Sequence, residues 1–374
     1  MRPAVAAEIV SGIVRARRSA ARRARANHAA YYRSIWTAAA GRVGVAVTDL
    51  GGGAIELALP ALTLRVRGTH VRLDGPEVLR RAGDKAHVSE LLAAAGLPVP
   101  PHRVVSPARL DEAAAFLAAA PDACVVKPAR DTAAGRGVTT GVRTPRDLRR
   151  AAVAAAAAAA RASALDGDPV RRAVRMAHGL DRMPLLIEHQ IPGANYRLLF
   201  LDGVLIDAIR RDAPVAVGDG RRSVGELLDA LNAARLRSGG GHAQVVVNRD
   251  LDLERTLADQ GLTVGAVPAA GRAVRLKTTI NDNAPDSNRP ALGLLCADLV
   301  DQARAAAAAV GARLAGVDVI TTNPGVSLAE SGGCLLEVNT TPGLAMHYHG
   351  HDGGTDVATD ILRQLAAQPR VETA

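Results

Sequence analysis

The sequence predicts a protein of mixed helices and strands that folds into two or three lobes. At 374 residues the chain is too long for one small core. Apolar residues make up 48% of it and aromatic residues only 2%, so alanine and aliphatic side chains must fill the interior. Segments with period-two alternation recur between alanine-rich helical segments, and no internal repeat is present.

The first 82 residues predict a helix followed by a small α/β lobe. Residues 1 to about 40 are rich in alanine and arginine, with no acidic residue between Glu8 and Asp49. Residues 43–73 then alternate as short strands broken by glycines and a proline. The segment lacks the apolar core of a secretory signal and has no Gly-x-Gly-x-x-Gly fingerprint. An organellar transit peptide would share its composition.

A second lobe is predicted over residues 83–184. Its expected elements, in order, are a helix ending at Gly96, a helix over 107–119, a strand over 123–128 and a helix over 145–163. Directly after Lys127, the loop over 129–138 holds Gly135, Arg136 and Gly137. Such a loop exposes backbone N–H groups that bind phosphate oxygens, although an ordinary hairpin turn fits the same pattern. The Walker spacing is absent, so the loop is not a P-loop.

The third lobe is predicted over residues 185–374. The expected elements are a strand over 185–191, a hairpin at Asp202-Gly203, a helix over 223–236, a strand over 273–276, a helix over 292–314, strands over 316–321 and 335–339, and a final helix before Gln368.

The last two of these strands carry a possible metal site. Side chains at positions i and i+2 of a strand share a face, so Glu337 and Asn339 lie side by side while Val338 faces the other way. The strand some twenty residues upstream carries one carboxylate, Asp318. Carboxylate and amide oxygens suit a hard cation such as Mg²⁺. A buried strand with satisfied polar residues fits this spacing as well.

Lysine is scarce in this chain. Of its 46 lysine and arginine residues, 43 are arginine, and only Lys85, Lys127 and Lys277 are lysine. Arginine is the default cation here, so each lysine indicates a site that needs a compact ammonium group.

Composition also narrows the class of protein. A net charge of +9 and a pI near 10.2 favour anionic ligands such as nucleotides and acidic substrates. Nucleic acid is not expected, because few aromatic residues stand among the basic ones. The longest apolar run, residues 151–160, is too short to span a membrane. Three widely spaced cysteines with no Cys-x-x-Cys pair indicate reduced thiols in the cytoplasm.

Taken together, these stretches resemble the ATP-grasp family of carboxylate–amine ligases, above all the ATP-grasp portion of the cyanophycin synthetases. The likeness covers roughly residues 83–350. The segments that carry it are Val125–Pro128 with the loop through Gly141, Ile187–Arg197, Arg211–Gly220, Gln260–Asn281, Ala315–Asp318 and Glu337–His347. The resemblance implies the ATP-grasp fold, in which two α+β lobes clamp ATP, here beside the small α/β N-terminal lobe.

The resemblance also implies roles for particular residues. Lys85 and Lys127 match lysines that contact ATP phosphates, and the 129–138 loop with Gly135, Arg136 and Gly137 matches the lid over them. The stretch from Leu186 to Ile191 matches the hinge that binds adenine. The residues implied to bind nucleotide there and beyond it are Glu188, His189, Ile191 and Asn195. Those implied to bind Mg²⁺, or alternatively Mn²⁺, are Asp318, Glu337 and Asn339. Those implied to be catalytic are Arg211, Lys277 and Asn281.

Three departures from the family pattern affect the expected substrate. Asn195 stands where an acidic residue usually holds the ribose hydroxyls. Asn283-Ala284-Pro285 replaces a Gly-Gly pair after Asn281. The second ATP-using ligase domain of the cyanophycin synthetases is not found, so one kind of ligation is expected.

The implied activity is ATP-dependent formation of an amide bond between a carboxylate of an amino acid or peptide and an amine. It proceeds through an acyl phosphate and releases ADP and phosphate. The general base is not identified, with His242, His347 and His349 as candidates beside the simpler reading of packing or surface histidines. The alternatives are a nucleotide-binding regulatory protein without turnover, a basic nucleic-acid-binding protein, and a ligase of the glutathione synthetase kind. The two substrates and any homo-oligomer stay open.

Overall fold

The computed structural model describes residues 28–130, 135–163, 179, 182–237, 246–280, 287–348 and 354–369. The chain divides into two compact units, one of Met1–Arg72, Ala230–Val246 and Asp356–Ala374, the other of Leu73–Asp229 and Val247–Thr355. Within the described ranges, no helix combines the length and apolar character needed to cross a membrane.

The smaller unit contains an antiparallel sheet in the order β1-β2-β3-β4. Its strands are β1 (Ala46–Gly51), β2 (Ala54–Ala58), β3 (Thr63–Arg67) and β4 (His70–Val71). In β2 and β3 every second residue is buried, as the alternation predicted. This unit also includes a helix over residues 28–43, in which Trp36 is fully buried, α12 (Val357–Ala366), and the part of α7 (Val224–Arg237) from Ala230 onward. Residues 1–27 of the predicted N-terminal helix lie outside the described residues.

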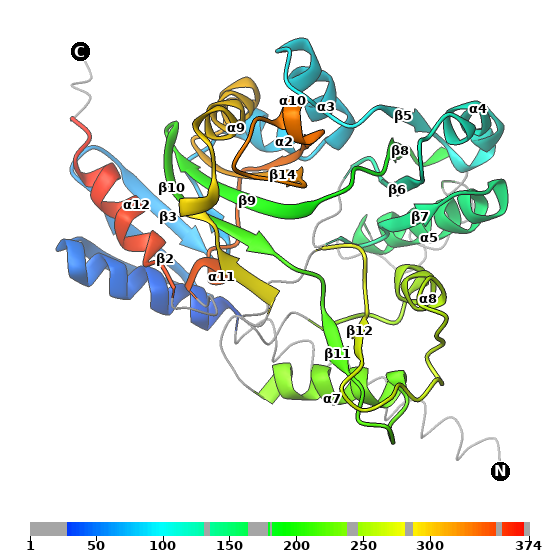
Figure 1. Ribbon diagram of the computed structural model, residues 1–374. Helices are drawn as coiled ribbons and strands as arrows, with labels where there is room; N and C mark the ends of the chain where they lie inside the picture. Colours follow the sequence, from blue (N-terminus) through cyan, green and yellow to red (C-terminus); the bar gives the residue numbers. More distant parts are fainter. Residues whose placement is uncertain are drawn as a thin grey trace. The chain divides into compact units, whose positions relative to one another are not determined.

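The larger unit contains a five-stranded antiparallel sheet in the order β13-β10-β9-β14-β15 (Figure 1). These strands are β9 (Ala194–Leu201), β10 (Val204–Arg211), β13 (Asn288–Pro290), β14 (Leu314–Thr321) and β15 (Cys334–Asn339). Positive φ angles at Asp202 (48°) and Gly203 (78°) form the tight turn that the Asp-Gly pair predicted between β9 and β10.

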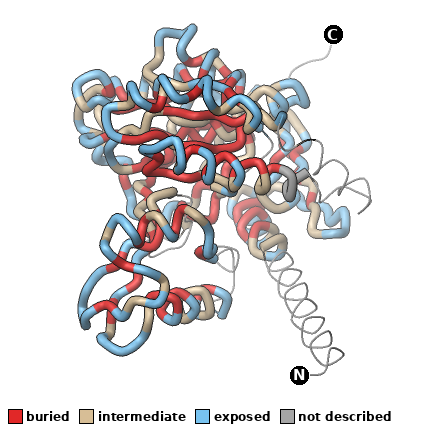
Figure 2. The backbone as a smooth tube through the Cα atoms, turned by 90° about the vertical axis from the view of Figure 1, so that its right-hand side faces the viewer, coloured by how far each residue is buried: buried red, intermediate tan, exposed pale blue. Residues whose placement is uncertain are grey.

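One face of this sheet is apolar and is covered by α3 (Lys85–Ala94) and α9 (Ala297–Val310). Its core includes Leu198, Val317 and Val338, each fully buried. Most residues of β9 and β14 are buried, and buried residues are red in Figure 2. Because side chains alternate, residues one position away from this core point to the opposite face.

A bulge in β15 sets which residues reach that opposite face. Val319 pairs with Leu335, and Asp318 pairs with Glu337, so Leu336 has no partner on β14. With regular pairing throughout β15, Leu335 and Val338 would lie on opposite faces, so the bulge lets both lie in the apolar core. The predicted side-by-side placement of Glu337 and Asn339, with Val338 on the other face, is confirmed.

The larger unit has a second antiparallel sheet, in the order β5-β8-β6-β7. Its strands are β5 (His102–Val105), β6 (Cys124–Pro128), β7 (Thr139–Val142) and β8 (Leu185–His189). The alanine-rich α5 (Pro145–Ser163) packs on it, as do α4 (Ala114–Ala118) and the 3₁₀ helix η1 (Pro107–Ala113). The helix predicted over 107–119 is therefore α-helical only in its second half, with non-helical backbone at Arg109.

The remaining described elements lie outside the two large sheets. They are α2 (Pro76–Ala82), β11 (Val215–Val217), α7 (Val224–Arg237), α8 (Leu251–Ala258), β12 (Ala273–Arg275), η6 (Leu292–Leu294), α10 (Leu328–Ser331) and α11 (Ala345–Tyr348). Strands β11 and β12 pair with each other. The helix predicted over 292–314 is wrong at both ends, because η6 precedes it and Gly311, with a φ of 80°, ends it. The sequence pattern missed α8 and β13.

Gly193 packs so closely that a side chain there should destabilise the larger unit. A Cβ atom at Gly193 would lie 2.4 Å from the carbonyl carbon of Thr321, and its φ is 134°. We expect Gly193→Ala to lower the free energy of unfolding by about 3 kcal/mol or more, since overpacking and backbone strain combine.

Gly332→Ala is the matched control, measured in the same denaturant titration. Gly332 has a φ of 66° with no atom within 4 Å of the added Cβ, so only the backbone cost of about 1–2 kcal/mol applies. Equal losses for the two variants would contradict the close packing of Gly193 on Thr321.

Candidate functional site

Charged and polar side chains gather on the face of the five-stranded sheet opposite its apolar core. Four strands supply them at positions that alternate with core residues. These side chains are Asn195 and Arg197 on β9, Arg211 on β10, Asp318 on β14, and Glu337 and Asn339 on β15. The structure thus brings the three predicted metal ligands together with two other predicted site residues, Arg211 and Asn195.

Asp318 is shared between two buried arginines. Arg197 donates to both of its carboxylate oxygens, at 2.6 and 2.7 Å, and Arg211 donates to Oδ2 at 2.9 Å. Burial alone would raise the pKa of Asp318, but the two guanidinium groups outweigh it and the pKa is lowered. Asp318 is therefore a carboxylate that holds two cations on one face of the sheet.

Asn195 and Gly316 help to hold the side chains of the two arginines in place. The Asn195 side-chain oxygen accepts from Nε and Nη2 of Arg211, at 2.8 and 2.5 Å. A Cβ atom on Gly316 would lie 3.3 Å from Cδ of Arg197 and 2.9 Å from Cβ of Pro342. Gly316 thus leaves room for the Arg197 side chain to lie across β14. The family resemblance placed Asn195 at the ribose, whereas in this structure its side chain contacts Arg211.

Glu337 and Asn339 lie beside this triad. Glu337 is paired with Asp318 across the strands, and its carboxylate lies 3.6 Å from the Lys85 ammonium. Asn339 donates from its amide nitrogen to the Gly316 carbonyl at 3.3 Å, which directs its amide oxygen away from that contact. In the described ranges, no group of three or more His, Cys, Asp or Glu side chains is arranged to hold a metal ion.

This donor set nonetheless fits Mg²⁺. Glu337 and Asn339 offer a carboxylate and an amide oxygen on one face, which are the ligands this ion prefers. Asp318 contributes less readily, because its oxygens already accept three hydrogen bonds from arginines.

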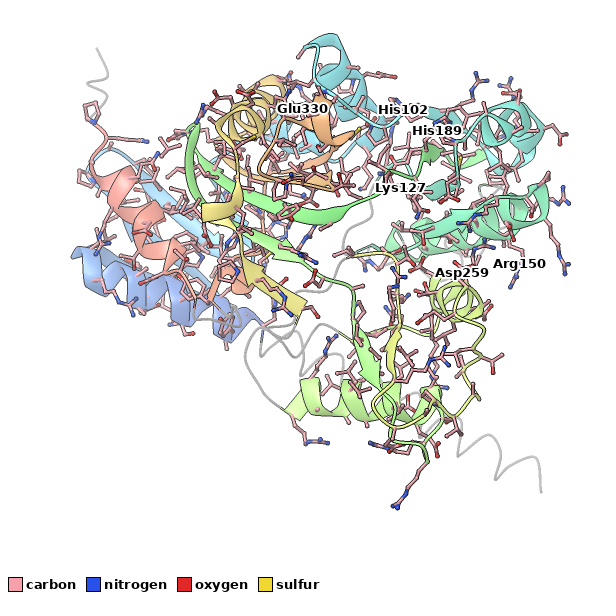
Figure 3. The ribbon with its side chains drawn as sticks, viewed as in Figure 1. His102, Lys127, Arg150, His189, Asp259 and Glu330 are labelled. Carbon is pink, nitrogen blue, oxygen red and sulfur yellow. The ribbon has the colours of Figure 1, made fainter. Side chains whose placement is uncertain are left out.

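Lys127 forms a buried ion pair on the four-stranded sheet. Its ammonium donates to Glu188 at 2.8 Å, from β6 to the neighbouring β8. Figure 3 shows Lys127 and His189 on these neighbouring strands.

Burial, and then the charge of Glu188, raises the pKa of both Cys124 and Cys334 to about 11. Because Cys334 opens β15, the Lys127–Glu188 pair lies near that end of the five-stranded sheet.

Lys85 is tied to the same region through its backbone. Its N–H donates to the carbonyl of Ala129 at 3.0 Å, just after β6. Asp84, the preceding residue, caps α3 and pairs with Arg130 at 2.7 Å. The two lysines predicted to bind phosphate are therefore held on connected backbone segments.

The predicted hinge and glycine loop are partly committed to packing. The backbone N–H of His189 donates to Pro101 and that of Gln190 to Ala123, while the His189 ring lies 4.5 Å from that of Phe116. Ile191 follows directly. In the loop, Gly135 and Gly137 have φ angles of 63° and 77° on either side of Arg136. A Cβ on Gly137 would lie 2.6 Å from that of Ala158, so α5 requires glycine there.

The ion pair described for Lys277 is with a residue of α8's N-terminus and not with Asp318 or its two arginines. The Lys277 ammonium forms this ion pair with Asp250 at the start of α8. Asn281, predicted beside it, lies outside the described residues, as do residues 131–134 of the loop and the candidate bases His242 and His349. The third candidate, His347, is buried and bonds through Nδ1 to Asp207 at 2.7 Å.

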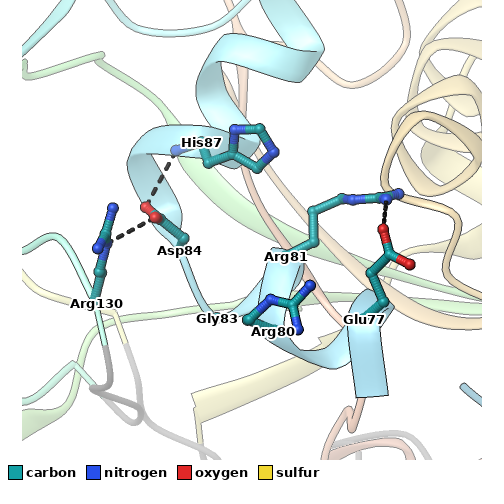
Figure 4. Close-up of a pocket in the computed structure, with 7 residues that line it drawn as sticks. All are labelled: Glu77, Arg80, Arg81, Gly83, Asp84, His87 and Arg130. Atoms are coloured by element: carbon teal, nitrogen blue, oxygen red, sulfur yellow. Dashed lines mark hydrogen bonds and ion pairs between the residues drawn. The ribbon is translucent and has the colours of Figure 1, made fainter. Parts of the chain in front are cut away.

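A pocket of about 460 Å³ opens beside this site but contains none of the predicted site residues (Figure 4). It is lined by Glu77, Arg80, Arg81, Gly83, Asp84, His87 and Arg130. Two ion pairs lie among these residues, Asp84 with Arg130 at 2.7 Å and Arg81 with Glu77 at 3.1 Å.

Sequence reasoning missed the functional placement of Arg197. A charged residue within the apolar run of β9, two positions from Asn195, was the available signal. Its partner Asp318 is 121 positions away in the sequence, so spacing alone could not join them.

Removing the Asp318 carboxylate should destabilise the fold far more than removing a solvent-accessible carboxylate that also has two arginine partners. We expect Asp318→Asn to lower the free energy of unfolding by about 3–5 kcal/mol, because two buried guanidinium groups lose their counter-ion. The matched control is Asp212→Asn. Asp212 pairs with Arg210 at 2.8 Å and Arg289 at 3.0 Å, and all three are solvent-accessible. There we expect at most about 1 kcal/mol. Similar losses in urea titrations would contradict the burial of the Asp318 triad.

The raised pKa values of two thiols predict their reactivity. At pH 8 a thiol with a pKa of about 11 is only about one part in a thousand thiolate, the form that reacts. We expect native protein to be alkylated by iodoacetamide at Cys296, which is half-buried, before Cys124 and Cys334. Labelling of these two should accelerate about tenfold per pH unit between pH 7 and 9. Mass spectrometry showing Cys334 modified as fast as Cys296 would argue against its burial near Glu188.

Comparison with known proteins gives relatives of two kinds. The chain is 28% identical over 286 residues to the cyanophycin synthetase of Nostoc sp., covering 76% of this chain and 29% of that protein. It is 27% identical over 286 residues to the glutathione biosynthesis bifunctional protein GshAB of Streptococcus thermophilus, covering 75% of this chain and 35% of that protein. The chain thus spans about a third of the length of these relatives. No family model matches it.

A solved structure gives the fold. The bifunctional glutathione synthetase from Pasteurella multocida is similar with a TM-score of 0.52 and 18% identity, over 89% of this chain and 43% of that one. The predicted fold class is thereby confirmed. The chain has the α+β ATP-grasp fold, and in sequence it resembles the cyanophycin synthetases and the bifunctional glutathione-biosynthesis proteins.

Proposed function

We propose that this chain is an ATP-dependent carboxylate–amine ligase. It joins the carboxylate of an amino acid or peptide to an amine and releases ADP and phosphate. The observation that carries the proposal is the polar sheet face, where Lys85 meets Glu337 beside Asp318 and its two arginines. The sequence likeness to cyanophycin synthetases and GshAB proteins supports the same reaction class.

In the first step, a carboxylate oxygen of the substrate attacks the γ-phosphorus of ATP, and the bond to the ADP oxygen breaks. Catalysis of this step consists of alignment and neutralisation of charge. We assign this role to Lys85 at the start of α3, Lys127 on β6 and Arg211 on β10, with Lys277 as the fourth cation. A Mg²⁺ ion at Glu337 and Asn339, with Asp318 as the third proposed ligand, would neutralise phosphate oxygens.

In the second step, the amine nitrogen attacks the carbonyl carbon of the acyl phosphate. The amide bond forms, the carbon–phosphate oxygen bond breaks, and phosphate leaves. The amine must lose a proton in this step, and no described residue is assigned that role.

Each proposed phosphate-binding lysine already has a carboxylate partner, Glu337 for Lys85 and Glu188 for Lys127. Phosphate oxygens would compete for these ammonium groups. Adenine would bind at the hinge, where the N–H groups of His189 and Gln190 serve the protein's own backbone. We therefore assign the adenine contact to Ile191.

The proposal is tested with ATP, Mg²⁺ and pools of amino acids, acidic peptides and amines. We expect a carboxylate–amine pair to stimulate release of ADP and phosphate, and hydroxylamine to trap the acyl group as a hydroxamate. ATP binding without ADP release for any pair would support a regulatory nucleotide-binding protein instead. Salt-dependent binding to oligonucleotides without ATP turnover would support the nucleic-acid alternative.

Glu337→Gln should lower turnover by about 100-fold or more, because it removes the carboxylate proposed to bind the metal and keeps the shape of the side chain. Glu330→Gln is the control. Glu330 is an exposed capping residue of α10, and glutamine serves the same cap. Rates are compared at saturating ATP and Mg²⁺. Unchanged turnover in Glu337→Gln would remove Glu337 from the site.

A further inference from the structure

Asp252 on α8 is a buried carboxylate that holds two distant segments together. Its residue is 1% exposed. Oδ1 accepts from the backbone N–H and the hydroxyl of Thr140, at 3.2 and 2.8 Å. Oδ2 accepts from the backbone N–H groups of Thr278 and Thr279, at 3.2 and 3.0 Å. Each carboxylate oxygen thus serves one segment.

Such a carboxylate is costly to bury unless its lone pairs are used. Asp252 forms no ion pair among the described residues, so its burial is compensated by these four hydrogen bonds and by its place in the first turn of α8, where the helix dipole favours a carboxylate. Two oxygens that accept equally are needed, because each faces donors only. Asparagine has a single accepting oxygen and can satisfy one segment at a time.

The two segments are those on which the proposed site depends. Thr140 belongs to β7, the strand that follows the glycine loop. Thr278 and Thr279 come directly after Lys277, whose ammonium pairs with Asp250 on the same helix. One turn further along α8, Arg255 donates to the carbonyl of Gly141 and pairs with Asp147.

Helix α8 and its N-cap therefore connect β7 to the Lys277 segment through four side chains among the described residues, those of Asp250, Asp252, Arg255 and Thr256. We infer that Asp252 is a positioning residue for Lys277, fixing where its ammonium lies relative to β7. The part of this inference that concerns turnover rests on the proposed ligase function. The part that concerns the placement of Lys277 does not.

The first experiment reads Lys277 directly and needs no turnover. The chain has three lysines, so limited acetylation followed by mass spectrometry reports each separately, with Lys85 and Lys127 as internal references. All three are largely shielded, with side chains 9–12% exposed. We expect Asp252→Asn to raise the acetylation rate of Lys277 by about fivefold to tenfold, because one segment loses its hydrogen bonds.

The expected pattern is specific to one lysine. Rates at Lys85 and Lys127 should stay within about twofold of those of the unmodified chain. Glu254→Gln is the matched control, since Glu254 lies on the same helix, is exposed and pairs only with Arg150 among described residues. An unchanged rate at Lys277, or an equal rise at all three lysines, would overturn the inference.

Thr140→Val guards against a variant that fails to fold. It keeps the shape of the side chain and removes one of the four donors while leaving the Thr278 and Thr279 contacts. We expect a smaller rise at Lys277, in proportion to the single lost hydrogen bond. Its absence, in a variant whose thermal melting matches the control, would also count against the inference.

The second experiment tests the consequence for turnover. Asp252→Asn should lower kcat by about 10- to 100-fold, the effect of a small misplacement of a charge, with little change in the dissociation constant for ADP. In a Lys277→Ala background the same substitution should have little further effect, because the residue that Asp252 positions is gone. Additive losses would show that Asp252 acts otherwise.

The two experiments separate the inference from the proposed function. If no substrate pair supports ADP release, the ligase proposal fails, while lysine acetylation still decides whether Asp252 places Lys277. If turnover is found and acetylation of Lys277 is unaffected by Asp252→Asn, the ligase proposal stands and the positioning role falls.

Discussion

The larger unit depends on one shared carboxylate. Asp318 lies on the central part of β14 and neutralises Arg197 from β9 and Arg211 from β10. Each of these charges would be costly to bury alone, so the three must be buried together. The three strands are therefore held in one register, and the sheet face opposite the apolar core is committed to polar chemistry. Asn195 accepts hydrogen bonds from Arg211, and Gly316 leaves room for the Arg197 side chain.

The three lysines repeat the same theme in milder form. Each forms an ion pair with a carboxylate, and the three pairs join α3 to β15, β6 to β8, and the segment after β12 to the start of α8. The three lysine side chains are only 9–12% exposed. An ammonium group carries three donors, so Lys127 and Lys277 can bind an anion while they keep their carboxylate partners.

The features that followed from the sequence had local signals. Glu337 and Asn339 share a face by strand periodicity, and Asp202-Gly203 forms a tight turn by its backbone preferences. The contacts of Arg197 with Asp318 and of Asp252 with Thr140 were not predictable in this way. Each joins residues more than a hundred positions apart, which only the fold brings together. Asn281 was named from the family resemblance and falls outside the described residues.

The errors in the predicted helices have a similar origin. Apolar periodicity continued past Gly311, but the positive φ of that glycine ends α9 and lets β14 begin. Helix α8 is only eight residues long, and two of its four buried residues, Asp252 and Thr256, are polar, so its N-cap, Asp250, was its main local sign. Short elements of this kind are defined by the partners that they meet in the fold.

The bulge at Leu336 makes β15 tolerant of one particular change in length. Loss of Leu336 would restore regular pairing of β15 with β14, because the pairs on either side of it already match. Glu337 and Asn339 would keep the polar face, and Val338 would stay in the apolar core. Loss of Val338 would instead put Asn339 directly after Glu337 and turn its side chain toward the core. Descendants of this chain should therefore vary in length at Leu336 and in the connection over residues 322–333, while keeping Glu337, Val338 and Asn339 contiguous.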